Sequence, residues 1–283
     1  MRRNNVSFGL LGLLALQFSV WSAGPLRPQD EKPGRFVHDQ GAVIRGDTAK
    51  KEIALVFTGH EFAEGGMLIR DILKKKEAPC GFFFTGDFYR KRENSNLVKS
   101  LLEDGHYLGP HSDKHLLYCR WEDRDELLVT KEEFTSDILR NYATMESFGI
   151  TRDKAAWFIP PYEWYNAEIV GWAKELGLVL FNFTPGTLAN ADYTTPDMAN
   201  YRPSAEIYQS ILNFERSDPC GLNGFILLVH LGTHPGRTDK FYRRLEGLLT
   251  DLQGRGYRFV RIDAMLKDGE PKLAGNVWND EVS

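Results

Sequence analysis

The chain has 283 residues, of which 42% are apolar and 12% aromatic. This composition is typical of a globular protein with a large core and argues against intrinsic disorder. The formal net charge of −4 shows no basic excess, so nucleic acid and anionic membrane surfaces are not expected partners. One large domain acting on a neutral substrate is the simplest expectation.

Residues 1–24 have the features of a secretory signal peptide: a basic start, an apolar run that ends at Trp21, and small residues suited to cleavage. They predict a secreted or periplasmic protein with no stable membrane insertion after cleavage. The alternative is an uncleaved anchor helix, but Gln17 and Ser19 interrupt a run that is already short for spanning a bilayer.

Three regions follow the signal peptide: a polar leading segment over residues 25–49, a folded domain over 50–268 and a tail over 269–283. In the domain, continuous apolar strand segments alternate with amphipathic helical segments. That alternation is typical of a parallel sheet covered on both faces or closed into a barrel. The expected strands are EIALVF, CGFFF, HYLG, KAAWF, VLFNF, GFILLV and YRFVRI, and the expected helices cover residues 67–76, 94–105, 166–177 and 242–256.

The histidines gather at the ends of these strands. Five of the seven follow three expected strands, namely His60, His111, His115, His230 and His234. In parallel α/β folds the functional site lies at the carboxyl ends of the strands. If GPHSDKH begins a helix, His111 and His115 lie on one face and chelate one divalent metal ion. The alternative is a pair of surface histidines at a polar helix start.

Three segments at the strand ends resemble motifs of the polysaccharide deacetylase family, carbohydrate esterase family 4. GHYLGPHSDKH is similar to the second motif, GHEIGNHTxxH, whose metal-binding histidines correspond to His111 and His115. GFILLVH resembles the last motif, which places Leu228 in the pocket for the acetyl methyl group and makes His230 the catalytic acid. FIPPYEWYN resembles the third motif, RPPY, with Tyr162 at its aromatic position.

The resemblance implies a fold and a reaction. The fold is a single α/β domain, a distorted (β/α) barrel of about seven parallel strands. The activity is that of a metal-dependent hydrolase that removes acetyl groups from an N- or O-acetylated polysaccharide or oligosaccharide. The cofactor is a divalent metal ion, Zn²⁺ or else Co²⁺ or Ni²⁺, and the partner is the acetylated glycan.

The first motif of the family is altered in this chain. In the family the first strand ends in TFDDG, with one Asp as general base and the next as metal ligand, whereas Thr58 and Gly59 occupy these positions here. We expect a backbone bulge at Gly59, which allows His60 to replace the metal ligand and Glu61 to replace the base. The alternative is that His60 and Glu61 are solvated loop residues.

Two other motifs differ as well. Ile159 replaces the Arg that pairs with the catalytic Asp in the family, so the base of this site is expected to have a higher pKa. The fourth motif, DxxDW, carries an Asp that orients the catalytic His. Its nearest match is Asp192, followed by Tyr193 in a long polar loop, where an ordinary turn Asp is the expectation.

The predicted site therefore combines three metal ligands with two catalytic side chains. Glu61 is expected to accept a proton from water, and the resemblance implies that His230 protonates the leaving group and that the backbone N–H of Tyr162 stabilises the oxyanion. The predicted metal ligands are His60, His111 and His115. Aromatic rings at the rim, Tyr162, Trp164 and Tyr165, either stack on sugar rings or belong to the core.

Two other functions compete with the deacetylase hypothesis. The first is a catalytically impaired glycan-binding protein on the same barrel, which keeps the histidine pair but has lost the base. The second is hydrolysis of an amide that is not a sugar derivative, because a barrel fold does not fix the substrate.

Overall fold

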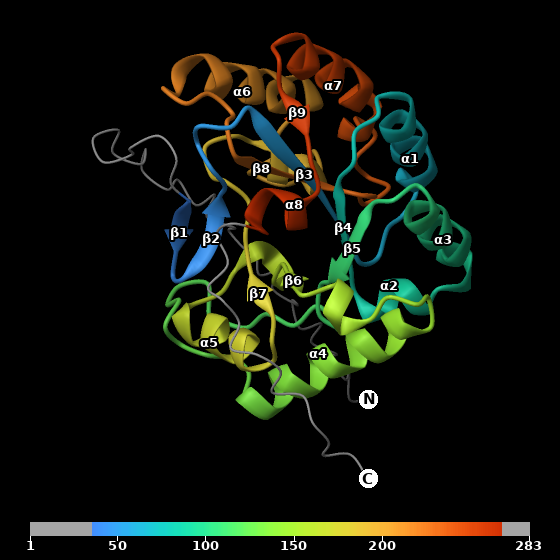
Figure 1. Ribbon diagram of the computed structural model, residues 1–283, viewed down its shortest axis with the longest axis vertical. Coiled ribbons are helices and arrows are strands. Elements are labelled where there is room, and N and C mark those ends of the chain that lie inside the picture. Colours follow the sequence, from blue (N-terminus) through green and yellow to red (C-terminus); the bar gives the residue numbers. More distant parts are fainter. Residues whose placement is uncertain (1–35, 268–283) are drawn as a thin grey trace, which may run out of the picture.

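The computed structural model describes residues 36–267 (Figure 1). The predicted signal peptide lies outside the described residues, as does the predicted tail over 269–283. Within residues 36–267, no helix has both the length and the apolar character needed to cross a membrane.

Parallel strands form the centre of the domain, and each expected strand is confirmed. They are β3 (Glu52–Gly59), β4 (Gly81–Phe84), β5 (Tyr107–Pro110), β6 (Trp157–Phe158), β7 (Val179–Leu180), β8 (Phe225–His230) and β9 (Arg258–Phe259). Hydrogen bonds join them in the order β5-β4-β3-β8, with β9 also on β3, and pair β6 with β7. All of these pairings are parallel.

Side chains connect the two sheets into a distorted barrel. The backbone N–H of Trp157 in β6 donates to the hydroxyl of Tyr107 in β5 at 2.8 Å. On the other side, the N–H of Ile226 in β8 donates to Thr184 Oγ1 at 2.9 Å, just after β7. The expected barrel architecture is confirmed, and its irregularity lies where a few hydrogen bonds, some of them from side chains, stand in place of a continuous strand pairing.

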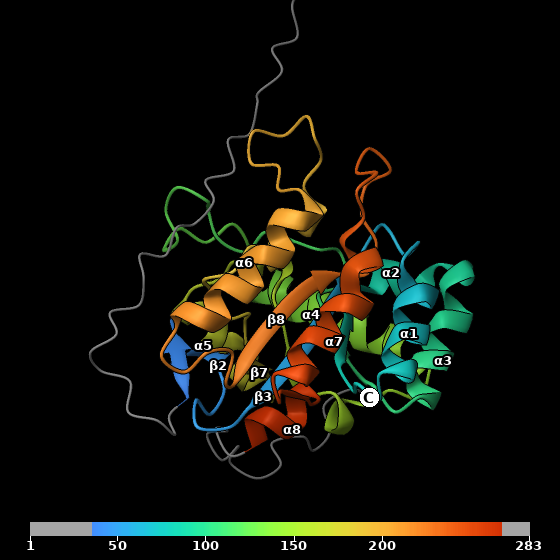
Figure 2. The ribbon, with the colours of Figure 1, turned by 90° about the horizontal axis from the view of Figure 1, so that it is seen from above.

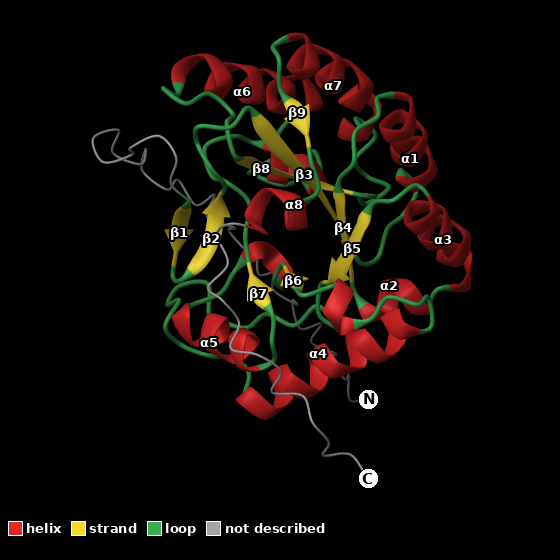
Figure 3. Cartoon of the chain, viewed as in Figure 1, coloured by secondary structure: helices red, strands yellow, loops and turns green. Residues whose placement is uncertain are grey.

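Helices surround the strands (Figure 3). They are α1 (Gly66–Lys75), α2 (Gly86–Arg90), α3 (Ser95–Glu103), α4 (Lys131–Glu146), α5 (Ala167–Glu175), α6 (Ser204–Ser217), α7 (Leu245–Gly254) and α8 (Ile262–Leu266). The sequence analysis missed α2, α4, α6 and α8. Helix α4 begins with a capping box in which the Thr130 hydroxyl accepts from the Glu133 N–H, a signal that the sequence does contain.

The alternation of side chains along the strands creates an inner and an outer core. In β3, Ala54 and Val56 belong to the apolar cluster inside the barrel, whereas Leu55 and Phe57 pack outward against the helices. Because successive side chains of a strand point to opposite faces, Thr58 continues the inner row. Thr58 pairs in register with His230 at the end of β8. Strand geometry alone thus brings both residues to the mouth of the barrel.

The loops after the strands rise on the side to which the arrow of β8 points, and α8 lies on the opposite side (Figure 2). The residues Ile262, Met265 and Leu266 of α8 are buried in the inner cluster. The barrel is therefore closed by apolar side chains at one end and carries its polar strand ends at the other.

A short hairpin, β1 (Val37–Asp39) and β2 (Ala42–Arg45), precedes the barrel. Arg45 is only 1% exposed; its guanidinium donates to the carbonyls of Gly221 and Asn223 and pairs with Asp218 at 3.3 Å. The last part of the expected leading segment is thus packed into the domain.

Candidate active site at the carboxyl ends of the strands

Strand β3 runs without a bulge through Gly59, which lies opposite Phe84 in register. A Cβ atom on Gly59 would lie 2.8 Å from Cδ1 of Phe84, so the aromatic ring packs directly on the glycine. The expected bulge at Gly59 is wrong, since the residue stays in the regular ladder and has no positive φ. Glycine is needed here because Phe84 occupies the space of a side chain, and a carboxylate at this position has no room.

We expect Gly59→Ala to destabilise the fold by about 1–3 kcal/mol, because the new methyl group overpacks against Phe84. Gly171→Ala is the matched control: Gly171 lies inside α5 with no atom within 4 Å of a built Cβ, so alanine should stabilise by roughly 0.5–1 kcal/mol. Urea denaturation of both variants measures the difference. Equal stability of the two would contradict the packing argument.

The segment with His111 and His115 is a loop and not a helix, which corrects the sequence-based expectation. Ser112 and His115 have φ values of 71° and 56°, which an α-helix does not allow. The buried carboxylate of Asp137, from α4, accepts hydrogen bonds from Ser112 Oγ at 2.6 Å and from the backbone N–H of Asp113 at 2.8 Å. A tertiary contact with a helix distant in sequence therefore sets this conformation.

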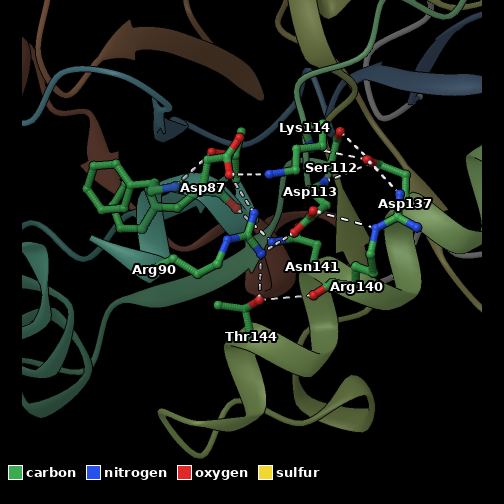
Figure 4. A network of polar contacts seen from close by, with 12 residues as sticks. Asp87, Arg90, Ser112, Asp113, Lys114, Asp137, Arg140, Asn141 and Thr144 are labelled. Carbon is green, nitrogen blue, oxygen red and sulfur yellow. Dashed lines mark hydrogen bonds and ion pairs between the residues drawn. The ribbon is translucent and has the colours of Figure 1, made fainter. Parts of the chain in front are cut away.

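Charged side chains from α2 and α4 surround the same loop (Figure 4). Asp113, 1% exposed, pairs with Arg90 at 2.6 Å, and Asp87 pairs with both Arg90 and Lys114 at 2.6 Å. Asn141 Oδ1 accepts from the backbone N–H of His111 at 3.0 Å. Both helices thus fix the loop that carries the two histidines.

Asp137→Asn should lower the free energy of unfolding by about 1.5–3 kcal/mol, because an amide replaces a carboxylate that accepts several hydrogen bonds. The exposed Glu132→Gln on the same helix is the control and should change it by less than about 0.5 kcal/mol. Denaturant titration tests both. A neutral Asp137→Asn would mean that the loop holds its shape without this carboxylate.

The imidazoles of His111 and His115 are suited to binding a metal ion. His111 Nδ1–H donates to the carbonyl of Ile159 at 2.8 Å, so Nε2 carries the free lone pair. The two ring centroids are 5.1 Å apart and the ring planes are inclined by 69°. Burial lowers the pKa of His111 to about 3 and that of His115 well below its usual value. Both rings are therefore neutral, as metal binding requires.

His60 lies beside this pair, but its ring is parallel to that of His115. Their centroids are 4.8 Å apart with an interplanar angle of 9°, and His60 Nδ1 contacts Thr85 Oγ1 at 3.0 Å. A ligated metal ion lies near the plane of each imidazole, and stacked planes do not meet. Within residues 36–267 no three His, Cys, Asp or Glu side chains form a metal-binding group. The His111 and His115 imidazoles fit a transition metal ion. His60 as the third ligand stays a prediction, and it requires the His60 ring to turn out of its stack on His115.

At the end of β8, a buried carboxylate holds His230. Asp192 Oδ1 lies 2.6 Å from His230 Nδ1, and Asp192 Oδ2 accepts the backbone N–H of His230 at 3.0 Å. Asp192 lies in the turn η4 (Ala189–Tyr193) and is 1% exposed. Burial alone would lower the pKa of His230, but Asp192 and then Glu163 outweigh it, so the pKa is raised. The expectation of an ordinary turn Asp is wrong: Asp192 orients His230.

The comparisons with known proteins decide the family. The family model described as polysaccharide deacetylase matches residues 45–181. The chain is 38% identical over 235 residues to a 30.6 kDa protein of Geobacillus stearothermophilus described as uncharacterized, with 82% of this chain and 77% of that one covered. This chain belongs to the polysaccharide deacetylase family. It is also 26% identical over 201 residues to a peptidoglycan-N-acetylglucosamine deacetylase of Bacillus cereus, covering 70% and 80% of the two chains.

A solved structure of the same family supports the fold. It is a carbohydrate esterase family 4 pseudoenzyme from Bacillus anthracis, with a TM-score of 0.61 and 20% identity over 81% of this chain and 70% of that chain. The likeness agrees with the distorted barrel described above.

Three positions of the deacetylase motifs line the mouth of the barrel without a charged side chain. Ile159 and Thr58 differ from the family, whereas Leu228 matches it. Ile159, at the family's Arg position, has a fully buried side chain in the inner cluster, and its carbonyl fixes His111. Thr58, at the position of the base, is 3% exposed and its hydroxyl has no hydrogen-bond partner in the described part of the chain. Leu228 is buried two residues before His230 on the same face, and its place in an acetyl pocket stays a prediction.

Aromatic rings form a rim next to the histidines. The Tyr162 ring, 41% exposed, lies 4.4 Å from the His115 ring and 5.7 Å from the Trp121 ring, and Trp121 stacks on Trp164 at 5.7 Å. The sequence analysis did not identify Trp121, because it lies in a loop just beyond the second motif and at none of the motif positions. Tyr165 is fully buried and belongs to the core, so of the two alternatives for this ring the core is correct.

Two carboxylates remain near the histidines. Glu61 is exposed directly after β3. Burial of the Tyr162 hydroxyl raises the pKa of Tyr162, and the charge of Glu61 raises it further, so Glu61 acts on the aromatic rim. Glu163, which the sequence analysis passed over, is half-buried, and its charge contributes to the raised pKa of His230.

Proposed function

We propose that this polysaccharide deacetylase family member is an active, metal-dependent hydrolase that removes acetyl groups from an N- or O-acetylated glycan outside the cytoplasm. The observation that carries the proposal is the bond between His230 and the buried Asp192 at 2.6 Å. A protein that only binds glycans has no need of a histidine whose pKa is raised at the mouth of its barrel. The Bacillus cereus relative makes peptidoglycan the first glycan to test.

The metal would be held by His111 and His115, with His60 as the third ligand. Bound Zn²⁺, Co²⁺ or Ni²⁺ supplies Lewis-acid polarisation of the acetyl carbonyl and a water of lowered pKa. The residues of the chain do the rest: His230 donates a proton to the departing nitrogen or oxygen, and Asp192 keeps the ring in place.

The rim and the inner wall of the barrel would position the substrate. The Tyr162 N–H has no acceptor in the described part of the chain and would donate to the oxyanion. Leu228 would contact the acetyl methyl group, while Tyr162 and Trp164 would stack on the sugar rings.

The test is acetate release from N-acetylated peptidoglycan fragments, a chitin pentasaccharide and acetylated xylan, by protein loaded with Zn²⁺, Co²⁺ or Ni²⁺. We expect release from at least one glycan and loss of release in His230→Ala with glycan affinity kept. Glycan binding without any acetate release by the loaded wild type would contradict the proposal.

That outcome would favour the second candidate, a glycan-binding protein on the same barrel. The specific observation behind it is the end of β3, where Thr58 has no carboxylate and Gly59 has no room for one. Calorimetric titration with the same glycans then measures the function that remains.

A further inference from the structure

The aromatic rings beside the histidines continue away from the metal-binding pair onto a loop at residues 119–127, which carries Trp121 and lies outside the motifs. We propose that Trp121 forms a second sugar-binding subsite next to the reaction centre, so that the substrate is a chain of sugar units and not a single acetylated sugar. The inference deepens the proposed deacetylase function and rests on it. It assigns the choice of substrate length to a residue that no motif contains.

Ring contacts lead without a gap from the metal-binding pair to Trp121. The Tyr162 ring lies 4.4 Å from the His115 ring and 5.7 Å from the Trp121 ring, and it meets both edge to face. Trp121 in turn stacks on Trp164, with centroids 5.7 Å apart and ring planes inclined by 30°. A sugar whose acetyl group lies at His115 therefore has Tyr162 beside it, and Trp121 is placed for the next sugar of the chain.

Backbone contacts hold the loop of residues 119–127 closed. Cys119 forms an antiparallel β-bridge with Leu127. The Arg120 N–H donates to the Glu126 carbonyl at 2.9 Å, and the two side chains pair at 2.5 Å. Trp121 follows directly after this closed base. A ring on such a loop has little freedom left to lose when a ligand binds, which favours affinity.

Two side chains tie this loop to the loop of the third motif. Trp164 Nε1 donates to the Arg120 carbonyl at 3.1 Å, and the Arg124 guanidinium lies 4.8 Å from the centroid of the Trp164 ring. The two loops are therefore joined by hydrogen bonding and by ring contacts. This joint keeps Trp121 in a fixed place relative to Tyr162.

The rings of this series are accessible to a ligand. Tyr162 is 41% exposed and Trp121 is half-buried. Tyr162 and Glu163 have φ values of 58° and 54°, in the left-handed region that side chains other than those of Gly, Asn and Asp rarely adopt. Strained backbone of this kind clusters at functional sites. Here the strained residue presents its ring to solvent between His115 and Trp121.

The chemistry of the loop fits an uncharged sugar. The C–H faces of a pyranose ring pack on aromatic rings while its hydroxyl groups stay in water, and Trp and Tyr suit such contacts because each combines an apolar face with a polar group. The neighbours of Trp121 in the loop include exposed carboxylates, Glu122, Asp123 and Asp125. Their charge disfavours an anionic unit at this subsite. The subsite therefore takes an uncharged unit such as N-acetylglucosamine.

The experiment compares metal-loaded wild type, Trp121→Ala and Trp121→Phe on para-nitrophenyl acetate, N,N′-diacetylchitobiose and the chitin pentasaccharide. Trp121→Ala should lose about 10- to 100-fold in kcat/KM on the pentasaccharide, because truncating an aromatic anchor of a binding site has effects of this size. On para-nitrophenyl acetate, which has no sugar, the loss should stay below about threefold. The loss should lie in KM, since a contact remote from the reacting carbon binds ground state and transition state alike.

Two further comparisons separate sugar binding from folding. In the wild type, kcat/KM should rise by about tenfold or more from the disaccharide to the pentasaccharide, and Trp121→Phe, which keeps a ring, should retain most of this rise. Leu128→Ala is the matched control, because Leu128 is 44% exposed directly after the same loop. Its activity should stay within about twofold of the wild type on every probe.

A binding measurement gives a readout without turnover. Calorimetric titration of the pentasaccharide into His230→Ala protein measures affinity when acetate release is blocked. Addition of Trp121→Ala to this variant should weaken binding by about 10- to 100-fold, whereas addition of Leu128→Ala should not change it.

The outcomes distinguish the inference from the function on which it rests. An active wild type whose kcat/KM does not rise with chain length overturns the subsite and leaves the deacetylase function standing, as does a Trp121→Ala variant that loses as much on para-nitrophenyl acetate as on the pentasaccharide. A wild type that releases no acetate, but whose pentasaccharide affinity falls in Trp121→Ala, overturns the deacetylase function and keeps Trp121 as a sugar-binding residue. Absence of pentasaccharide binding overturns the subsite.

Discussion

Asp192→Asn is expected to reduce acetate release by about two to four orders of magnitude. The carboxylate of Asp192 accepts both Nδ1–H and the backbone N–H of His230. An asparagine side chain has one acceptor oxygen and one donor NH₂ group, so it cannot accept both hydrogen bonds. It also carries no charge to stabilise the imidazolium. The variant should therefore hold less of the protonated His230 that donates to the leaving group. Steady-state kinetics on the chitin pentasaccharide measures the loss.

The pH dependence of the same variant gives an independent check. In the wild type the pKa of His230 is raised by Asp192 and Glu163 despite burial, with Arg237 acting in the opposite direction. An acid with a raised pKa is active below that pKa and loses its proton as the pH rises through it. Without Asp192 the alkaline limb of the rate profile should move to lower pH. Asp197→Asn, an exposed change in the same loop, is the control, and an unshifted profile in Asp192→Asn would exclude His230 as the acid.

The sequence predicts the place of the site because strand periodicity decides it. His60, His111, His115 and His230 all follow apolar strands, and parallel strands end at one edge of the barrel. The alternation of inward and outward side chains along β3 and β8 then pairs Thr58 with His230. The apolar pattern and its alternation are visible in the sequence, whereas the register of β3 against β8 comes from the structure.

The contacts that complete the site depend instead on residues distant in sequence. Asp192 reaches His230 across 38 positions, and Asp137 shapes the histidine loop from 25 positions beyond Ser112. The spacing of His111 and His115 favours a helix, but buried hydrogen bonds to Asp137 outweigh that local preference. Tyr162 and Glu163 follow an apparent motif match, and the sequence gives no sign of their left-handed backbone. Such tertiary choices leave no periodic signal.

His111→Ala is expected to weaken Zn²⁺ binding by more than about 100-fold, because loss of an outer partner of a metal ligand alone costs roughly 10- to 100-fold. His111 has its Nδ1–H fixed on the Ile159 carbonyl, so its Nε2 is already oriented before metal arrives. His115→Ala should behave alike, since the two inclined rings provide the donor pair. Isothermal titration with Zn²⁺ at constant pH gives the affinities, and the proton release on binding should be small because burial keeps both rings neutral.

His60→Ala separates two arrangements of the same site. If the His60 ring turns out of its stack on His115 and becomes the third ligand, this variant should lose affinity nearly as severely as His111→Ala. If the stacked ring and its contact with Thr85 persist in the loaded protein, the loss should stay at about tenfold, the lower end of the effect of an outer-shell partner. His106→Ala, a buried histidine that accepts the Cys80 N–H away from the strand ends, is the control and should leave the affinity unchanged. Unchanged binding in both His111→Ala and His115→Ala would contradict the metal site, since the donor chemistry of this barrel mouth depends on those two rings.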